Sequence, residues 1–358
     1  MNNLSSMFKN QVVLVSGHTG FKGSWLCLWL HSLGARVVGV SKEITTSPSH
    51  YEHTKNFLSH DLRANIEDKD TFSKILKTYK PVFIFHLAAQ AIVVNSFKEP
   101  YQTFSTNTLG TLNLLEALRN YPLECSAVLI TSDKSYQNRE LDRGYHEEDR
   151  LGGEDPYSGS KGAAELIINS YYHSFFTHQS KIKIGIARAG NVIGGGDWSI
   201  GRLIPDAIRA WTKQESLLIR NPESTRPWQH VLEPLFGYLQ FAASLQNSSI
   251  SSGTALNFGP SSIDTQKVFN VANLLKSNLE KFSWHQENLT EGFHESKLLA
   301  LDSSKAKARL NWQTHLPIEE VIQWTATWYK NFYSDKQMNC ADFSRQQIDL
   351  YTNRLKDD

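Results

Sequence analysis

The sequence is poor in cysteine, with three in 358 residues. Cys27, Cys125 and Cys340 stand far apart, without the CxxC or cysteine–histidine spacing of zinc ligands. The thirteen histidines are scattered; His50 and His53 are close, but no carboxylate–histidine pattern frames them. We therefore expect neither a disulfide framework nor a metal site.

An excess of charge and a long apolar run are also absent. Lysine and arginine total 37 against 36 aspartate and glutamate, so the formal net charge is +1 and nothing favours nucleic acid or an anionic membrane as a partner. No apolar run approaches the ~20 residues that span a bilayer. The opening MNNLSSMFKNQ is polar and lacks the apolar stretch of a signal peptide. We expect a cytoplasmic protein in which local groups neutralise any anionic ligand.

What the sequence does contain is an alternation of strand-like and helix-like segments. Hydrophobic residues make up 40% and aromatic residues 11%, as in a globular protein. Periodicity predicts strands at 11–17, 35–41, 81–89, 126–133 and 181–194, and helices at 21–34, 68–80, 106–120 and 160–176. This order predicts βαβ units, and hence an α/β fold with a doubly wound parallel sheet.

The rhythm loosens after residue 190, where GGGDW and RNPESTRPW separate shorter elements. We expect a Rossmann-type dinucleotide-binding domain over residues 8–190, with later segments returning to it. Residues 191–333 are expected to form mainly a smaller C-terminal substrate-binding lobe. Residues 334–358 are expected to be a loosely attached tail.

A glycine-rich loop joins the first expected strand to the first helix. SGHTGFKGSW places Gly17, Gly20 and Gly23 in a GxxGxxG spacing. Glycines there permit a tight turn, close approach of the backbone to a pyrophosphate and close packing of helix on strand. The N–H groups of the helix N-terminus then face the phosphates. The loop therefore predicts dinucleotide binding; the alternative is a plain turn with a glycine for helix packing.

The acidic residue that usually follows the second strand of such a site is missing. Ser41 and Lys42 stand where a carboxylate would bind the adenosine ribose, and Glu43 comes one position further on. We expect NAD rather than NADP, although the missing acid weakens the distinction. Asp61, in HDLR, is a candidate for contact with the adenine, or else an ordinary exposed turn residue.

The stretch YSGSK places a phenol and an ammonium one helical turn apart. Asp155 suits a helix N-cap and Pro156 the first helical position, so Tyr157 and Lys161 share a face. A nearby lysine lowers the pKa of a tyrosine, which makes the phenolate a usable base for a sugar hydroxyl. Taken alone, this spacing is equally that of an ordinary surface helix.

A second cluster follows a buried strand and favours a catalytic function for Tyr157 and Lys161 over an ordinary surface helix. ITSDKSY ends the strand at 126–133, and ligands bind at the carboxyl ends of strands in open parallel sheets. Ser132 can donate a hydrogen bond to the substrate oxygen that Tyr157 deprotonates. Asp133 and Lys134 place an acid and an amine beside it.

These motifs resemble a known family. GHTGFKG, HLAAQ, TSDK and YSGSK together are similar to the extended short-chain dehydrogenase/reductase family, in its sugar-nucleotide 4,6-dehydratase branch. Longer stretches resemble the CDP-glucose group of that branch, over residues 10–330: GGEDPYSGSKGAAEL, RAGNVIGGGDW, RLIPDAIRA, IRNPESTRPWQHVLEPL and LDSSKAKARLNW. Most dehydratases have glutamate after the aspartate. Lys134 is a departure that the CDP-glucose group shares.

The resemblance implies a redox-neutral dehydration of CDP-glucose with tightly held NAD, in deoxysugar biosynthesis of the lipopolysaccharide type. Tyr157 would deprotonate the sugar 4-hydroxyl, Ser132 would hold its oxygen, and Lys161 would hold the tyrosine anion. Lys134 would take the C5 proton, or only order Asp133 or a water. Asp133 would protonate the departing 6-hydroxyl. The implied cofactor residues are Gly17, Thr19, Gly20, Phe21, Lys22, Gly23, Ser41, Asp61, Leu62, Leu87, Ala88, Ala89, Gln90, Thr106, Tyr157 and Lys161.

The nucleotide-sugar side is less defined by the sequence. Arg226 is the first candidate for the pyrophosphate, since a guanidinium binds phosphate oxygens in pairs. Several other residues are candidates, and each has an alternative as a solvated, capping or core residue. They are Ser96, Asn191, Arg202, Leu203, Arg220 and His230, with Trp198 and Trp228 for packing on the nucleotide.

Two other functions share parts of this pattern. A sugar-nucleotide epimerase uses the same Tyr157–Lys161 pair but needs no acid for a leaving group. A catalytically inactive NAD-binding scaffold needs neither. The helices at 106–120 and 160–176 match the pair that builds the subunit interface in the family, so we expect a homodimer or homotetramer.

Overall fold

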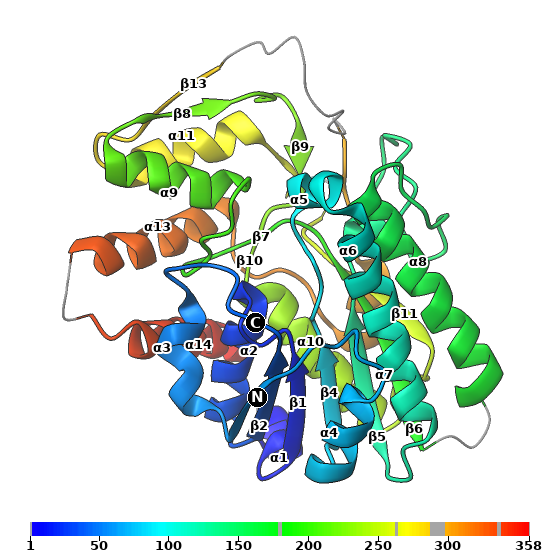
Figure 1. Ribbon diagram of the computed structural model, residues 1–358. Coiled ribbons are helices and arrows are strands. Elements are labelled where there is room, and N and C mark those ends of the chain that lie inside the picture. The colour runs from blue at the N-terminus through cyan, green and yellow to red at the C-terminus, as the bar shows by residue number, and fades with distance from the viewer. Residues whose placement is uncertain (1, 178–180, 262–263, 287–297, 335–337, 358) are drawn as a thin grey trace.

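A seven-stranded parallel sheet forms the centre of the protein (Figure 1). The computed structural model describes residues 2–177, 181–261, 264–286, 298–334 and 338–357. The strand order is β11-β6-β5-β4-β1-β2-β3, and every pair is parallel. The strands are β1 (Val12–Ser16), β2 (Arg36–Ser41), β3 (His60–Arg63), β4 (Phe83–His86), β5 (Cys125–Ile130), β6 (Ile182–Ala189) and β11 (Thr254–Phe258). The predicted doubly wound sheet is confirmed.

The central strands are mostly apolar because helices cover both faces of the sheet. Every residue of β4 and β5 is buried, as expected for a parallel sheet. The strand β3 is different: its sequence HDLR is charged and largely exposed at the edge of the sheet. The sequence pattern did not predict β3, because a short polar edge strand carries no apolar periodicity.

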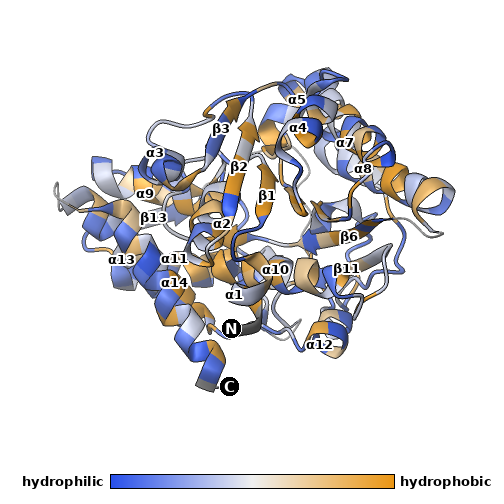
Figure 2. Cartoon of the chain, turned by 90° about the horizontal axis from the view of Figure 1, so that it is seen from below, coloured by the Kyte–Doolittle hydropathy of each residue, from blue (hydrophilic) through white to orange (hydrophobic). Residues whose placement is uncertain are grey.

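Two helical layers enclose the sheet (Figure 2). The first layer contains α4 (Thr71–Tyr79), α7 (Gly110–Arg119) and α8 (Pro156–Tyr171). The second contains α1 (Asn2–Phe8), α2 (Phe21–Ser32), α10 (Leu232–Gln246) and α14 (Cys340–Asp357). Short turns connect them: α3 (His50–Thr54), η1 (Lys55–Phe57), α5 (Val93–Lys98), α6 (Pro100–Phe104), the π-helical η2 (Ser105–Leu109), η3 (Asp133–Ser135) and the π-helical η4 (Tyr172–Phe176).

A smaller lobe lies above the sheet in Figure 1. It contains α9 (Leu203–Lys213), α11 (Val268–Asn278), α13 (Ile318–Ser334) and three two-stranded sheets, whereas α12 (Ser304–Leu310) packs against α10 and β11 of the main sheet. The sheets pair β7 (Val192–Ile193) with β10 (Gln229–His230), β8 (Ser216–Ile219) with β13 (Ser283–Gln286), and β9 (Thr225–Arg226) with β12 (Gln266–Lys267). Because α10 and β11 return to the main sheet, the lobe is interleaved with it. No helix in the described ranges is long and apolar enough to cross a membrane.

The prediction of a loosely attached C-terminal tail is wrong. Helix α14 packs against α2 and α3, and Tyr351 on it is fully buried. The Tyr351 ring meets Trp29 edge-on at 5.9 Å, and its hydroxyl donates to Glu233 Oε2 at 2.6 Å. The buried side chains of α14 lie in a sequence that is mostly polar, so the apolar pattern alone did not predict this packing.

Replacing Tyr351 tests how much α14 contributes to the core. Tyr351→Ala removes a buried ring and one donor to Glu233, and we expect a loss of about 3–5 kcal/mol in the free energy of unfolding. Leu350→Ala, on the exposed side of the same helix, is the matched control and should cost less than about 0.5 kcal/mol. Denaturant unfolding measures both. A loss for Tyr351→Ala as small as that expected for Leu350→Ala would mean that α14 is dispensable for the fold.

Candidate active site

The glycine loop lies at the carboxyl end of β1, as its spacing predicts. Gly17 has a positive φ of 78°, and a Cβ there would stand 2.6 Å from the Ala88 backbone nitrogen. A Cβ on Gly23 would stand 2.2 Å from the Gly17 carbonyl oxygen. These two glycines are therefore required for packing α2 against the ends of β1 and β4.

Gly20 has a different surrounding from its two neighbours. A Cβ there would meet only the Gly17 carbonyl oxygen, at 3.3 Å. Gly20 is the N-cap of α2, and neither a side-chain cap nor an acidic residue occupies the first turn of that helix. The N-terminus of α2, beginning at Phe21, therefore presents its positive end to the site, which suits a phosphate group.

A histidine that sequence reasoning missed occupies the position beside the second strand. His18 lies inside the glycine loop, where no spacing rule marks it. Its Nδ1 lies 3.0 Å from Ser41 Oγ, and its Nε2 lies 2.9 Å from Asp61 Oδ1. Thr19 joins the same cluster, since its hydroxyl donates to the Glu43 carbonyl at 2.7 Å. Ser41 thus stands at the end of β2 with its hydroxyl already bonded to protein.

Asp61 is an ion-paired strand residue rather than a turn residue. It lies on β3, next to Leu62, and it bonds to His18, Tyr51 and Arg63. Burial raises the pKa of Asp61, but hydrogen bonds from Tyr51 and His18 outweigh this and hold the pKa below its usual value. Its carboxylate is about one third exposed, at 32%.

The end of β4 supplies a half-buried segment, residues 87–90, facing the glycine loop. The backbone N–H of Gln90 donates to Asn107 Oδ1 at 2.8 Å, and Asn107 Nδ2 donates to Ser160 Oγ at 2.8 Å. Asn107 therefore ties Leu87, Ala88, Ala89 and Gln90 to α8. Its neighbour Thr106 lies inside a continuous helical run, so it is not a cap, and its hydroxyl donates to Glu67 at 3.0 Å.

The second cluster forms a tight turn directly after β5. Ser132 caps η3: its Oγ accepts from the Lys134 N–H at 3.2 Å and donates to Asp133 Oδ1 at 2.9 Å. Asp133 is only 3% exposed, and its Oδ2 has no hydrogen-bond partner among the described residues. Burial raises the pKa of Asp133, although Lys134, Ser132 and Arg226 oppose the shift. A buried carboxyl whose pKa is raised therefore stands beside the half-buried Lys134.

Helix α8 begins at Pro156 with Asp155 as its N-cap, as predicted, and the Ser158 N–H donates to Asp155 Oδ1 at 3.0 Å. Tyr157 and Lys161 are both buried, at 7% and 6% exposure. The structure thus brings the phenol, the amine and the η3 turn into one enclosed region.

The expectation of a lowered tyrosine pKa is wrong for this structure. Burial raises the pKa of Tyr157; a hydrogen bond with Ser132 lowers it again in part, while the nearby Asp133 adds to the rise. Burial also lowers the pKa of Lys161 to about 8, against the attraction of Glu165. Desolvation is the dominant effect because both side chains are enclosed. A phenolate at neutral pH therefore needs additional positive charge in the site.

Two of the three predicted arginines reach this region. Arg226, on β9, is 4% exposed, and its charge acts on Asp133. Arg202, the N-cap of α9, pairs with Asp197 at 3.0 Å, and its charge acts on Tyr157. Arg220 is exposed beyond the end of β8. Arg226 and Arg202 are therefore the cations placed to meet an anionic substrate.

Two uncharged candidates lie at the same lobe. Asn191 follows β6, is half-buried, and its carbonyl accepts from the Gln229 N–H at 3.0 Å. Leu203 is the half-buried first residue of α9. Both therefore stay candidates for substrate contact.

Two other substrate candidates are core residues instead. Ser96 is fully buried, and its hydroxyl donates to the Val93 carbonyl at 2.7 Å. His230 is fully buried between Trp25 and Trp324, and burial lowers its pKa to about 3. Both side chains are enclosed in the structure, so contact of either with a substrate stays a prediction. The tryptophans considered for nucleotide packing, Trp198 and Trp228, are also buried.

Comparison with known proteins decides the family. A family model described as GDP-mannose 4,6 dehydratase matches residues 14–325. The chain belongs to this family. It is 40% identical to CDP-glucose 4,6-dehydratase of Salmonella typhimurium, over 97% of this chain and 97% of that protein. It is 30% identical to dTDP-D-glucose 4,6-dehydratase of Dictyostelium discoideum, over 63% of this chain and 52% of that protein.

The fold has close structural relatives as well. An epimerase from Methanothermobacter thermautotrophicus superposes with a TM-score of 0.80 at 22% identity, covering 93% of this chain and 96% of that chain. At this identity the likeness shows the fold alone. No cluster of metal-ligating side chains occurs among the residues that the structure describes.

Lys22 is the cofactor candidate with the most altered electrostatics. Burial lowers its pKa to about 7, and the nearby cations Lys161 and Arg202 lower it further, against Asp133. Its Nζ lies 5.9 Å from the centre of the Tyr238 ring. The first turn of α2 therefore carries an amine that changes charge near neutral pH.

The raised pKa of Asp133 predicts how stability depends on pH. A carboxyl with a folded-state pKa above its ordinary 3.8 contributes its full stability below that value and loses it as pH rises through the folded pKa. Asp133→Asn keeps an Oδ1 acceptor for Ser132 but cannot ionise. We therefore expect the variant to melt above the wild type near pH 7, with the difference vanishing in acid.

Asp61→Asn is the control of opposite sign. Its lowered pKa means that Asp61 stabilises the fold above its ordinary pKa and loses this as pH falls. Thermal melts of both variants across a pH series measure the two effects. A lower melting temperature for Asp133→Asn at neutral pH would contradict a raised pKa of Asp133.

Proposed function

We propose that the protein is a CDP-glucose 4,6-dehydratase that uses NAD. It would convert CDP-D-glucose to CDP-4-keto-6-deoxy-D-glucose and water. The observation that carries this proposal is the buried carboxyl of Asp133, with its raised pKa, beside Ser132 and Lys134. Loss of a 6-hydroxyl needs an acid at that place, whereas epimerisation needs none. The choice of cytidine is supported by the similarity to the Salmonella protein.

The glycine loop fits a dinucleotide. The open N-terminus of α2 at Gly20 would hold the pyrophosphate, and the close approach of Gly17 to Ala88 shapes the cradle between β1 and β4. Ser41 and Lys161 would hold the two riboses. NAD⁺ held by these residues would supply a hydride acceptor for C4 of the sugar and, once reduced, the hydride donor for C6.

Three residues would serve the C4 position. Tyr157 would remove the proton of the 4-hydroxyl, and Ser132 would donate a hydrogen bond to the same oxygen. Since burial raises the pKa of Tyr157, the base form depends on cations brought next to it. Lys161, whose pKa of about 8 leaves it mostly protonated at pH 7, is one of these.

Two residues would serve the elimination. The 4-ketone acidifies the C5 proton, and Lys134, in its neutral amine form, would accept it. Asp133 would give its proton to the departing 6-hydroxyl, which leaves as water. In the alternative role, Lys134 orders Asp133 or a water, and its charge then opposes the protonation of Asp133.

The pyrophosphate of the substrate would meet local cations. The formal net charge of +1 gives no general attraction for anions, so Arg226 and Arg202 would supply it. Asn191 and the N-terminus of α9 at Leu203 lie at the same lobe and would add N–H donors.

A panel of nucleotide-glucoses tests the proposal. With NAD⁺ present, we expect turnover of CDP-glucose to a ketosugar, detected by its absorbance in alkali, in preference to the uridine, thymidine and guanosine analogues. Tyr157→Phe should lose on the order of 10²-fold or more in turnover while still binding nucleotide. A C4-inverted hexose as product would indicate an epimerase, and no product from any analogue would indicate a scaffold. Near-wild-type turnover in Tyr157→Phe would remove Tyr157 from the mechanism.

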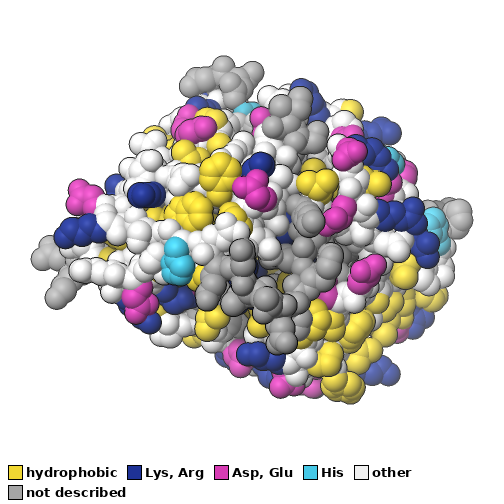
Figure 3. All heavy atoms as spheres, turned by 90° about the horizontal axis from the view of Figure 1, so that it is seen from above, with side chains coloured by type: hydrophobic (Ala, Val, Ile, Leu, Met, Phe, Trp, Pro, Cys, Tyr) yellow, Lys and Arg dark blue, Asp and Glu magenta, His cyan; other side chains and the backbone are white. Residues whose placement is uncertain are grey.

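We also propose that two copies associate through α6, α7 and α8. Large apolar side chains are exposed on this layer: Tyr101 at 84%, Phe104 at 41%, Leu109 at 46%, Leu166 at 62% and Phe175 at 47%. In Figure 3 hydrophobic side chains gather at the lower right, the side on which α8 lies. A contiguous apolar patch of this kind marks an association surface. The cytoplasmic location and the choice between dimer and tetramer stay predictions.

A charge placed in this patch tests the association. We expect Leu166→Glu to shift the protein from dimer or tetramer to monomer, because the interface would bury an unpaired carboxylate. Leu350→Glu, at 59% exposure on α14, is the matched control and should leave assembly unchanged. Light scattering with size exclusion measures both. An unchanged mass in Leu166→Glu would place the interface elsewhere.

A further inference from the structure

A buried ion pair lies directly behind the candidate active site. Arg188 on β6 is 2% exposed and Glu165 on α8 is fully buried. Arg188 Nε donates to Glu165 Oε1 at 2.8 Å and to Oε2 at 3.0 Å, and Arg188 Nη2 also donates to Oε2. A pair removed from water in this way stabilises a fold only weakly on balance, because desolvation offsets the attraction. Its placement therefore calls for a reason other than stability.

One end of the η3 turn is attached to this pair. Thr131 follows β5 and directly precedes Ser132, and its hydroxyl donates to Glu165 Oε1 at 2.6 Å. The carboxylate thus holds the residue through which the chain enters the turn.

The other end of the turn is attached to the same pair. Tyr136 follows η3 directly, and its hydroxyl accepts from Arg188 Nη1 at 2.7 Å and donates to Asn257 Oδ1 at 2.7 Å. The Arg188 guanidinium carbon also stands 4.8 Å from the centre of the Tyr136 ring. The residue through which the chain leaves the turn is therefore bonded to the arginine.

The pair also reaches the helix that carries the phenol and the amine. Glu165 comes one turn after Lys161 on α8, so the two share a face. The negative charge of Glu165 favours protonated Lys161, against the burial that lowers the pKa of Lys161 to about 8. One carboxylate therefore contacts the start of the turn and acts on the amine of α8.

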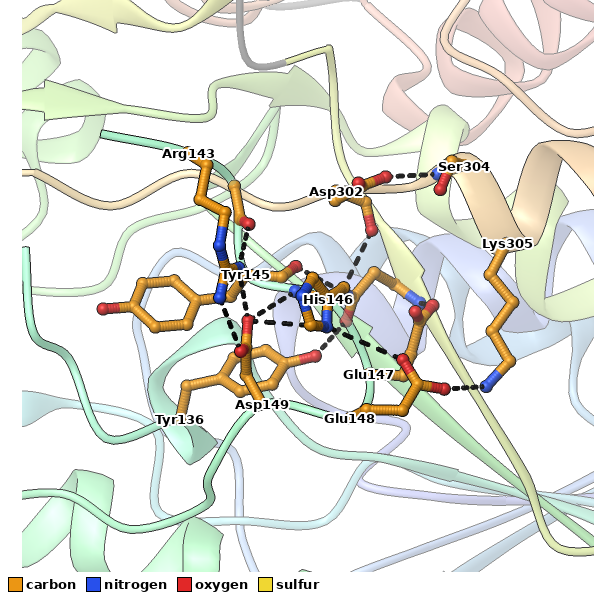
Figure 4. A network of polar contacts seen from close by, with 12 residues as sticks. Tyr136, Arg143, Tyr145, His146, Glu147, Glu148, Asp149, Asp302, Ser304 and Lys305 are labelled. Atoms are coloured by element: carbon orange, nitrogen blue, oxygen red, sulfur yellow. Dashed lines mark hydrogen bonds and ion pairs between the residues drawn. The ribbon is translucent and has the colours of Figure 1, made fainter. Parts of the chain in front are cut away.

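A loop outside the turn holds Tyr136 in place (Figure 4). The Tyr136 ring stacks on Tyr145, with centroids 5.3 Å apart. Tyr145 is held in turn, because its carbonyl accepts from Asn257 Nδ2 at 2.7 Å. Ion pairs from Arg143 to Asp149 and from Glu148 to Lys305 fasten the surface of this loop. The ring therefore has little freedom to turn away from Arg188.

We propose that the Arg188–Glu165 pair positions the 131–136 turn against α8 through its hydrogen bonds with Thr131 and Tyr136. The four are positioning residues: they would fix Ser132, Asp133 and Lys134 relative to Tyr157 without contacting substrate. The kinetic part of this inference rests on the proposed function, whereas the structural part does not.

Two variants remove one hydroxyl each while keeping the shape of the side chain. Tyr136→Phe frees one end of the turn and Thr131→Val the other. Amide hydrogen exchange on the protein without ligand is the first readout. We expect severalfold faster exchange at Lys134, Ser135 and Tyr136, whose N–H groups bond within the turn, and no change in β1.

Matched controls remove equally buried hydroxyls elsewhere. Tyr121→Phe loses a bond to the Pro81 carbonyl, and Thr325→Val loses one to the Val321 carbonyl. Both should leave exchange in the 131–136 turn at the wild-type rate. Faster exchange throughout the molecule in the test variants, or an unchanged turn, would overturn the inference.

Kinetics supply the second readout. We expect kcat for the nucleotide sugar to fall roughly tenfold in Tyr136→Phe and Thr131→Val, with KM nearly unchanged. The reason is that each variant disturbs the geometry of the reacting groups but leaves substrate binding intact. Thr131→Ser restores the donor and should restore kcat. Wild-type kcat in both variants, or a loss confined to KM, would refute the positioning role.

The two proposals fail in different ways. If wild-type protein turns over another nucleotide sugar in place of CDP-glucose, the proposed substrate is wrong, and the kinetic comparison is made with that sugar. If the wild type turns over none, hydrogen exchange still decides whether the ion pair orders the turn. If one variant does not fold, as judged by circular dichroism, the other hydroxyl deletion decides the outcome.

Discussion

Removal of water from the carboxyl edge of the central sheet governs the ionisable groups collected there. Burial is the largest cause of the raised pKa of Asp133 and Tyr157 and of the lowered pKa of Lys161 and Lys22. Each shift favours the uncharged form. The site therefore holds an acid whose pKa is raised beside amines whose pKa values are lowered, a combination that exposed side chains do not offer.

The enclosure depends on how the two lobes interleave. A Cβ on Gly190 would stand 2.6 Å from Pro227 Cγ and 3.3 Å from Asp133 Oδ2. The exit of β6 and the segment after β9 thus close over Asp133 with no room for a larger side chain. Arg226, in the same segment, brings a positive charge that partly offsets the desolvation of Asp133. Pro227, which helps to enclose Asp133, and Arg226, which supplies a positive charge near it, are therefore neighbours in the chain.

Local patterns in the sequence predicted the elements that position the site. The apolar runs of β4 and β5, the cap Asp155–Pro156 of α8 and the glycines of the first turn all follow from neighbouring residues, and the structure has them. His230, Ser96 and Tyr351 could not be placed in this way, because their burial depends on residues distant in the sequence. The predicted direction of the pKa shift of Tyr157 was wrong for the same reason. The spacing between Tyr157 and Lys161 is local in the sequence, whereas the burial of Tyr157 depends on distant residues.

The sequence does indicate one further residue near the site that was not predicted. Glu165 stands four residues after Lys161, and this helical spacing alone marks it as a neighbour of the site. Arg188 and Tyr136 carried no such mark, because three separate elements bring them together. The proposed roles of Ser132, Asp133 and Lys134 come from the family resemblance, while the structure shows that the three residues share one turn.

The packing of Tyr351 on Trp29 joins α2, near one end of the described chain, to α14, near the other. During synthesis on the ribosome, the α2 segment emerges before α14. The apolar surface around Trp29 and Phe236 therefore lacks the cover of Tyr351 until α14 has emerged. The nascent chain must keep this surface from aggregating while the more than 300 residues between α2 and α14 are added.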